Sequence, residues 1–140
     1  WMNLFNNAFD AIGEDGFIFV RTKLCAHRRR VVVTVADTGP GIGEDDLDKI
    51  FDPFFSTKPV GKGTGLGLSV TFGIIKDHGG RINALSPAPN EYMPSEMEEQ
   101  IQIGAGTVFI IELPVVDDVL PEDECEEATR HVVRSEQSSA

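Results

Sequence analysis

Glycines alternate with other residues across positions 61–67, and an apolar pattern begins directly after them. Such a glycine run favours a loop, while the apolar spacing that follows predicts a helix over about 66–78. A helix N-terminus presents free backbone N–H groups and a positive dipole end, which together suit a phosphate. Lys58 and Lys62 add cations to the loop. The stretch predicts a nucleotide site under a glycine-rich lid at about 52–66, with an ordinary surface loop as the alternative.

Two asparagines lie four residues apart in a predicted helix over residues 1–12, and an acid follows on the same face. Asparagine is unfavourable inside a helix, so Asn3 and Asn7 call for a reason. The carbonyl oxygen of an asparagine suits Mg²⁺, which takes few protein ligands and leaves the rest to water and phosphate. The pattern therefore makes Asn7 a candidate metal ligand, with Asn3 and Asp10 beside it. The alternative is that these side chains simply face solvent.

An aspartate follows a β-branched strand predicted at 31–36 and precedes a turn that contains Gly39 and Gly41. A carboxylate at the end of a strand can accept a hydrogen bond from an amino group, such as that of adenine. The two glycines let the backbone approach a flat base closely. Asp37 is therefore a candidate base-recognition residue. The alternative is an aspartate that bonds only its own turn.

The other predicted elements are organised around these three stretches. Phe51, Phe54 and Phe55 surround Pro53, either as the anchor of a mobile lid or as ordinary core. Residues 87–106 read as an inserted polar loop. Residues 115–140 read as a disordered acidic linker or tail with one weak helical turn near 124–133. The predicted strands are 17–25, 31–36, 81–86 and 107–113, and a short helix is predicted at 44–50.

Composition limits the function classes. The chain has 140 residues, 41% of them hydrophobic, enough for one domain with a core. A net charge of −11 argues against nucleic acid as a partner, and no apolar run approaches the length of a membrane span. Two cysteines, Cys25 and Cys125, suggest neither a disulfide framework nor a metal site, so a cytoplasmic setting is expected. Because Trp1 falls inside a predicted helix, we expect a piece of a longer protein.

Four stretches stand in a fixed order along the chain: Asn-Leu-Phe-Asn-Asn-Ala, Asp-Thr-Gly-Pro-Gly-Ile, Phe-Asp-Pro-Phe-Phe-Ser-Thr-Lys and Gly-Lys-Gly-Thr-Gly-Leu-Gly-Leu. Together they resemble the N, G1, F and G2 boxes of the catalytic ATP-binding domain of bacterial sensor histidine kinases. That domain belongs to the wider GHKL group, which contains gyrase, heat-shock chaperone and mismatch-repair ATPases. The resemblance covers residues 1–114.

The resemblance implies an α+β fold of the Bergerat (GHKL) type, a two-layer α/β sandwich in which helices back a mixed β-sheet. The family's first strand would precede Trp1, so the domain is expected to be truncated at its N-terminus. Asn7 matches the catalytic asparagine that holds Mg²⁺, and Asp37 matches the aspartate that binds the adenine amino group. The residues that the resemblance places around ATP are Asn3, Asp37, Gly39, Gly41, Ile42, Phe54, Thr57, Lys58, Lys62, Gly63, Thr64, Gly65, Leu66, Gly67, Leu68 and Thr107.

The implied function is binding of ATP with Mg²⁺ and donation of the γ-phosphate to a histidine on a separate dimerisation domain of the same full-length kinase. A homodimeric kinase, cytoplasmic or anchored in a membrane by other segments, would then pass the phosphate to a response regulator. The catalytic domain itself is expected to contact neither membrane nor nucleic acid. The alternatives are an ATPase of the gyrase or chaperone kind and a degenerate nucleotide sensor or scaffold.

Several features depart from the family pattern. Many members carry a Lys or Arg three residues after the magnesium asparagine, where this chain has Asp10. Lys58 or Lys62 is the expected replacement for that cation. The loop at 87–106 is longer than usual. No histidine of the chain lies in the phosphoacceptor motif, so the acceptor is expected outside it; the three histidines are His27, His78 and His131.

Overall fold

The computed structural model describes residues 1–14, 16–25, 27, 29–59, 63–93 and 106–115, together with the backbone of 130–134. The helices and strands follow the sequence pattern closely. The elements are α1 (Met2–Ile12), β1 (Phe17–Cys25), β2 (Arg30–Asp37), α2 (Glu44–Leu47), α3 (Gly67–Asp77), β3 (Arg81–Leu85), the 3-10 helix η2 (Asn90–Tyr92), β4 (Thr107–Pro114) and β5 (Arg130–Arg134).

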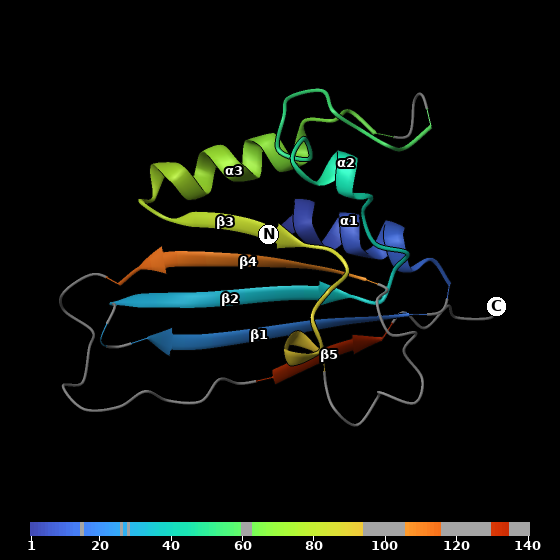
Figure 1. The fold of residues 1–140 in the computed structure, drawn as a ribbon. Helices are drawn as coiled ribbons and strands as arrows, with labels where there is room; N and C mark the ends of the chain where they lie inside the picture. The colour runs from blue at the N-terminus through green and yellow to red at the C-terminus, as the bar shows by residue number, and fades with distance from the viewer. Residues whose placement is uncertain are drawn as a thin grey trace.

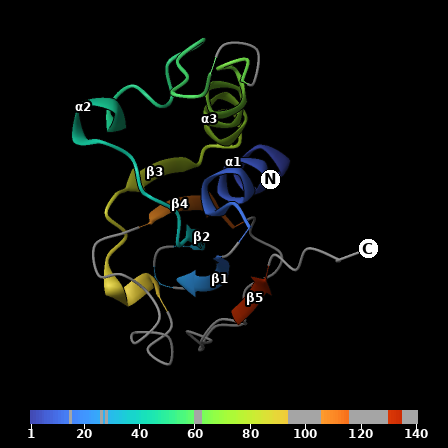
Figure 2. The same ribbon diagram turned by 90° about the vertical axis from the view of Figure 1, so that its right-hand side faces the viewer.

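The strands form one sheet in the order β3-β4-β2-β1-β5, and α1 and α3 lie side by side against one face of it (Figures 1 and 2). The predicted two-layer α/β architecture is therefore confirmed. The β-branched strand β2 occupies the middle of the sheet, as its apolar run favours. Asp37, the last residue of β2, therefore lies at the end of the central strand.

The expectation of a mixed sheet is wrong for the described strands, because every pairing between them is antiparallel. β2 and β3 do run in the same direction, but β4 lies between them and pairs with both. The prediction missed that the late strand β4 lies between β2 and β3, which separates these two strands of the same direction.

The main core lies between the sheet and the two helices. Leu4 of α1 and Ile75 of α3 pack with Val33, Ile82 and Ile111 from the sheet. On α1, Leu4, Ala8 and Ile12 are buried at intervals of four residues, which is the spacing of one helical face. That spacing leaves the opposite face of α1, which carries the asparagines, free to line a site.

The C-terminal region differs in part from the expectation. Residues 130–134 form β5, which pairs antiparallel with β1 and is the outermost strand on that side of the sheet, instead of a disordered tail or a helical turn. The segment Arg-His-Val-Val-Arg is short and does not alternate between polar and apolar residues, and its pairing with the distant strand β1 gives no local signal. The other residues of the predicted tail, 116–129 and 135–140, lie outside the described residues, as do 94–105 of the predicted insertion.

The short helix predicted at 44–50 is also shorter than expected, because α2 ends at Leu47 and the chain continues through turns. Across the ranges that the structure describes, no helix combines the length and the apolar character needed to cross a bilayer.

Candidate functional site

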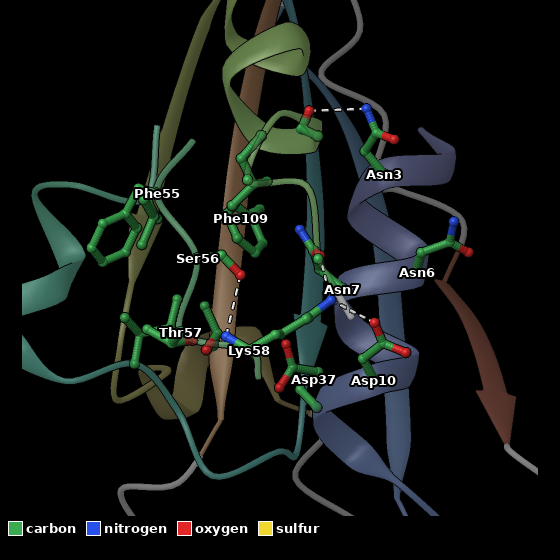
Figure 3. A pocket seen from close by; sticks show the side chains of 18 of the residues that line it. Asn3, Asn6, Asn7, Asp10, Asp37, Phe55, Ser56, Thr57, Lys58 and Phe109 are labelled. Atoms are coloured by element: carbon green, nitrogen blue, oxygen red, sulfur yellow. Dashed lines mark hydrogen bonds and ion pairs between the residues drawn. The ribbon is translucent and has the colours of Figure 1, made fainter. Parts of the chain in front are cut away.

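A pocket of about 440 Å³ opens between α1, the ends of β2 and β4, and the segment that leads into α3 (Figure 3). Helix α1 supplies the polar side chains on one side, α3 contributes Gly67 and Leu68, and the sheet supplies the floor. The pocket lining consists of Asn3, Asn6, Asn7, Asp10, Ala11, Asp37, Pro40, Gly41, Ile42, Ile50, Phe55, Ser56, Thr57, Lys58, Gly63, Thr64, Gly65, Gly67, Leu68, Thr107 and Phe109.

Asp37 is the buried acid of this pocket, with only 3% of its surface exposed. Its Oδ1 accepts a hydrogen bond from the backbone N–H of Gly39 at 2.9 Å. The backbone N–H of Thr107, which is the partner of Asp37 across the β2–β4 ladder, is a second donor to the carboxylate. These two donors fix the carboxylate, and acceptor lone pairs remain for a ligand in the pocket.

The backbone around Asp37 has no space for additional side chains. A Cβ at Gly39 would lie 2.8 Å from Cβ of Ala11, and one at Gly106 would lie 2.1 Å from the carbonyl oxygen of Asp37. Gly106 also has a φ of +94°, which L side chains rarely adopt. The glycines at these positions therefore let α1 and the end of β4 approach the aspartate directly.

Burial raises the pKa of Asp37 from 3.8 to about 6, and the hydrogen bonds from Gly39 and Thr107 oppose this rise. Burial disfavours the charged form, so the cause is the loss of solvent around the carboxylate. An acid of this kind costs stability when it is ionised. At neutral pH it is nevertheless mostly charged, and so available as an acceptor for an amino group.

We expect the free energy of unfolding to depend on pH because of this raised pKa of Asp37. Because the native pKa exceeds the unfolded value, the stabilising contribution of protonated Asp37 is complete below pH 3.8 and is lost as the pH rises through about 6. Relative to Asp37→Asn, the free energy of unfolding of the unmodified protein should fall by roughly 2 to 3 kcal/mol between pH 4 and pH 7. Urea unfolding of both proteins at several pH values measures this difference. A difference that does not vary with pH would contradict the raised pKa.

Asn7 and Asp10 line the α1 side of the pocket, and the ammonium group of Lys58 bridges them (Figure 3). The ammonium group of Lys58 donates to Oδ1 of Asn7 at 3.3 Å and forms an ion pair with the carboxylate of Asp10. The amide oxygen of Asn7 is thus already turned toward a positive charge. Of the two expected replacements for a helix cation, Lys58 lines the pocket and pairs with Asp10, and Lys62 lies outside the described residues.

Asn3 occupies the pocket wall but directs its amide toward α3. Its Nδ2 donates to the carbonyl oxygen of Gly67 at 2.9 Å and to Oγ1 of Thr71 at 3.2 Å. The hydroxyl of Thr71 also donates to the carbonyl oxygen of Gly67. Asn3 therefore ties the first turn of α3 to α1, which fixes the direction in which the N-terminus of α3 points.

A backbone hydrogen bond joins the two ends of the segment between Phe54 and Gly65, which precedes α3. The backbone N–H of Phe54 donates to the carbonyl oxygen of Gly65 at 2.9 Å. Gly65 has a φ of +66°, and a Cβ there would lie 2.4 Å from the carbonyl carbon of Phe54. Only glycine fits this contact, which brings Ser56 and Thr57 back over the pocket next to Gly63.

Most of the residues predicted around the nucleotide are brought together here. The predicted residues in the lining are Asn3, Asn7, Asp37, Gly41, Ile42, Thr57, Lys58, Gly63, Thr64, Gly65, Gly67, Leu68 and Thr107. Three others lie outside it: Gly39 supports Asp37 from behind, and Leu66 and Phe54 are 37% and 77% exposed. Phe55, not Phe54, lines the pocket.

Sequence reasoning also missed several lining residues. Asn6 lies next to Asn7 on α1, and Phe109 rises from β4 two residues after Thr107. Ser86 supports the floor from outside the lining, since its hydroxyl accepts from the N–H of Ile42 at 2.8 Å and donates to the carbonyl of Gly106. The alternation of β4 could have indicated Phe109, because residues 107 and 109 share one face of a strand.

Comparison with known proteins places this geometry in a family. The model described as "Histidine kinase-, DNA gyrase B-, and HSP90-like ATPase" matches residues 1–117. Sensor kinase CckA of Brucella abortus is 46% identical over 126 residues, which cover 81% of this chain and 12% of CckA. Sensor histidine kinase ZraS of Salmonella typhimurium is 43% identical over 82% of this chain and 21% of its own length. The chain thus spans about a fifth or less of these relatives.

Solved structures agree with the sequence relatives. The catalytic domain of histidine kinase ThkA matches with a TM-score of 0.60 and 38% identity, over 81% of this chain and 62% of that one. Full-length ShkA in complex with AMPPNP matches with a TM-score of 0.59 and 28% identity, over 81% of this chain and 20% of ShkA. A complex of ThkA with response regulator protein TrrA matches with a TM-score of 0.56 and 33% identity, over 82% of this chain and 27% of that one. This chain belongs to the family of histidine kinase-, DNA gyrase B- and HSP90-like ATPase domains, and these relatives are sensor histidine kinases.

Proposed function

We propose that this chain binds ATP with Mg²⁺ and donates the γ-phosphate to a histidine on a separate domain. One observation carries the proposal: a single pocket has a buried carboxylate at its floor and a cation-facing amide on its wall. The same pocket has a glycine-lined helix N-terminus at its mouth. The carboxylate suits the amino group of a base, the amide suits a metal, and the helix N-terminus suits a chain of phosphates.

Asn7 fits the metal. Its Oδ1 already accepts from the ammonium of Lys58, so the oxygen faces a position where a cation is stable. An amide oxygen is a hard ligand of the kind that Mg²⁺ takes, with phosphate oxygens and water as the others. When bound, the metal would neutralise charge on the transferred phosphoryl group. Asn7 would hold it, and Asn6 and Asp10 lie beside it in the pocket wall.

The remaining residues bind and orient the nucleotide. Asp37 accepts from the adenine amino group, while Gly41 and Thr107 form the backbone surface beside the base. Gly63, Gly65 and Gly67 line the path to α3, whose free N–H groups suit phosphate oxygens. In phosphoryl transfer, such positioning and charge neutralisation supply most of the rate, because little covalent chemistry falls to the protein.

His78 lies too far from the pocket to accept the phosphate. His78 lies at the C-terminal end of α3, where its ring bonds the carbonyl of Ile74, and α3 enters the pocket at its other end. Eleven helical residues separate the two ends by about 16 Å. We therefore propose a histidine-bearing dimerisation domain of the same full-length, homodimeric kinase as the acceptor, in a cytoplasmic setting.

The relatives support this assignment. ShkA has been solved with AMPPNP and ThkA with the response regulator protein TrrA, so AMPPNP and a response regulator both occur among the matching structures. We propose the corresponding ligands for this chain. ATP is the nucleotide that it binds, and a response regulator is the downstream partner of the full-length kinase.

Radiolabelled phosphate tests the proposal. Incubation of the chain with γ-labelled ATP, Mg²⁺ and a purified histidine-hairpin domain should label that domain, and replacement of its histidine by glutamine should abolish the label. Without the hairpin domain, the chain should hydrolyse ATP slowly because the nucleophile is missing. Fast autonomous hydrolysis without labelling would assign the chain to the gyrase and chaperone ATPases. Binding of ATP with neither reaction would indicate a nucleotide sensor.

A further inference from the structure

Lys58 reaches from the segment over the pocket to two residues of α1 that are 51 and 48 positions away in the sequence. Its Nζ lies 3.3 Å from Oδ1 of Asn7 and pairs with the carboxylate of Asp10 (Figure 3). Asn7 and Asp10 are three residues apart on α1, which places their side chains on the same face. One cation thus joins the candidate metal ligand to an acid one turn further along.

The contact also fixes the segment that covers the pocket. The backbone N–H of Lys58 donates to the hydroxyl of Ser56 at 3.2 Å, which closes a tight turn. Lys58 is only 33% exposed in its side chain, whereas Asp10 is 60% exposed. The lysine stem therefore lies against the pocket while the carboxylate holds its charged end from the solvent side.

Metal and lysine compete for the same oxygen. A divalent cation on Oδ1 of Asn7 would lie next to the ammonium of Lys58, and two positive charges at that separation repel strongly in a partly enclosed site. Loading of the metal therefore requires Lys58 to leave Asn7. Asp10 opposes that departure, because it holds the ammonium through an ion pair.

We propose that Asp10 is a positioning residue that holds Lys58 on Asn7 as a substitute for the metal, so that metal loading and movement of segment 55–59 occur together. This inference rests on the proposed function, since it takes Asn7 as the metal ligand. When the metal–nucleotide complex enters, Lys58 is released from Asn7 and becomes available to the phosphates that line up along Gly63 and Gly65.

The first test needs no nucleotide. Hydrogen–deuterium exchange of the empty protein should show about three- to fivefold faster exchange in peptides that cover segment 55–59 in Asp10→Asn and in Lys58→Met, in line with the modest strength of an exposed ion pair. Asp77→Asn, which removes an exposed acid at the end of α3, is the matched control and should leave these peptides unchanged. Equal exchange in all four proteins would overturn the proposal.

The second test measures the competition. In calorimetric titrations with ADP at several Mg²⁺ concentrations, Lys58→Met should lower the half-saturating Mg²⁺ concentration about threefold, because the competing cation is gone. Asp10→Asn in the Lys58→Met background should not lower it further, since the proposed hold acts only through Lys58. An unchanged or higher half-saturating concentration in Lys58→Met would contradict the competition. Failure of the unmodified chain to bind ADP would instead refute the proposed function, and the exchange result would remain interpretable.

Discussion

Asp37→Ala is expected to weaken the binding of ATP and ADP on the order of 10²- to 10³-fold. The carboxylate is buried and receives the backbone N–H groups of Gly39 and Thr107. Its removal takes away the proposed acceptor for the adenine amino group, a charge-assisted bond of about 1.5 to 3 kcal/mol, and leaves the two backbone donors unpaired. Displacement of a fluorescent ADP analogue measures the loss.

The Asp37→Asn variant distinguishes a loss of base recognition from a loss of folding stability. The amide keeps the size of the side chain, and its oxygen can still accept from Gly39, but its NH₂ group opposes the adenine amine. We therefore expect Asp37→Asn to fold at least as stably as the unmodified protein at neutral pH, and to lose most of the affinity. If Asp37→Asn bound ADP as tightly as the unmodified chain, Asp37 would not be the residue that recognises the base.

Gly65→Ala is expected to reduce nucleotide affinity about 10²-fold while most of the sheet and α1 remain folded. An alanine at a φ of +66° costs about 1 to 2 kcal/mol, and its Cβ would lie 2.4 to 2.7 Å from three backbone atoms of Phe54. The close contact between Gly65 and Phe54 must then open, which would displace Thr64 and Gly67 from the proposed path of the phosphates. Calorimetric titration with ADP measures the affinity.

Gly73→Ala is the matched control for this variant. Gly73 lies inside α3, and a Cβ there would have no atom within 4 Å. Replacing a glycine in a helix by alanine stabilises it by about 0.5 to 1 kcal/mol, so Gly73→Ala should bind ADP normally and melt slightly higher. Similar affinities for the Gly65→Ala and Gly73→Ala proteins would show that the contact between Gly65 and Phe54 does not shape the site.

Local patterns are sufficient to predict α1, α3 and the strands β1 to β4. The apolar spacing of α1 predicts a stripe of Leu4, Ala8 and Ala11; Leu4 and Ala8 are buried as expected, and Ile12, beside that stripe, is the third buried residue in place of Ala11. The β-branched run predicts β2 and hence the position of Asp37. These features depend on the period of a helix or strand, which a sequence displays directly.

Contacts between segments that are distant in the sequence could not be predicted from local patterns. The pairing of Lys58 with Asp10 joins residues 48 positions apart, and the bridge of Ser86 between Ile42 and Gly106 depends on how three loops meet. The choice between Phe54 and Phe55 was equally open, because a turn decides which of two neighbouring rings faces the pocket. No local pattern records such contacts, since tertiary packing determines them.

Calorimetric titration of the unmodified chain with ADP, with and without Mg²⁺, tests the central claim most directly. We predict one saturable site per chain whose affinity increases when Mg²⁺ is added, because in the proposed site Asp37 binds the base and Asn7 binds the metal. The absence of binding by a demonstrably folded chain, or binding that Mg²⁺ leaves unchanged, would contradict a nucleotide–metal site in this pocket.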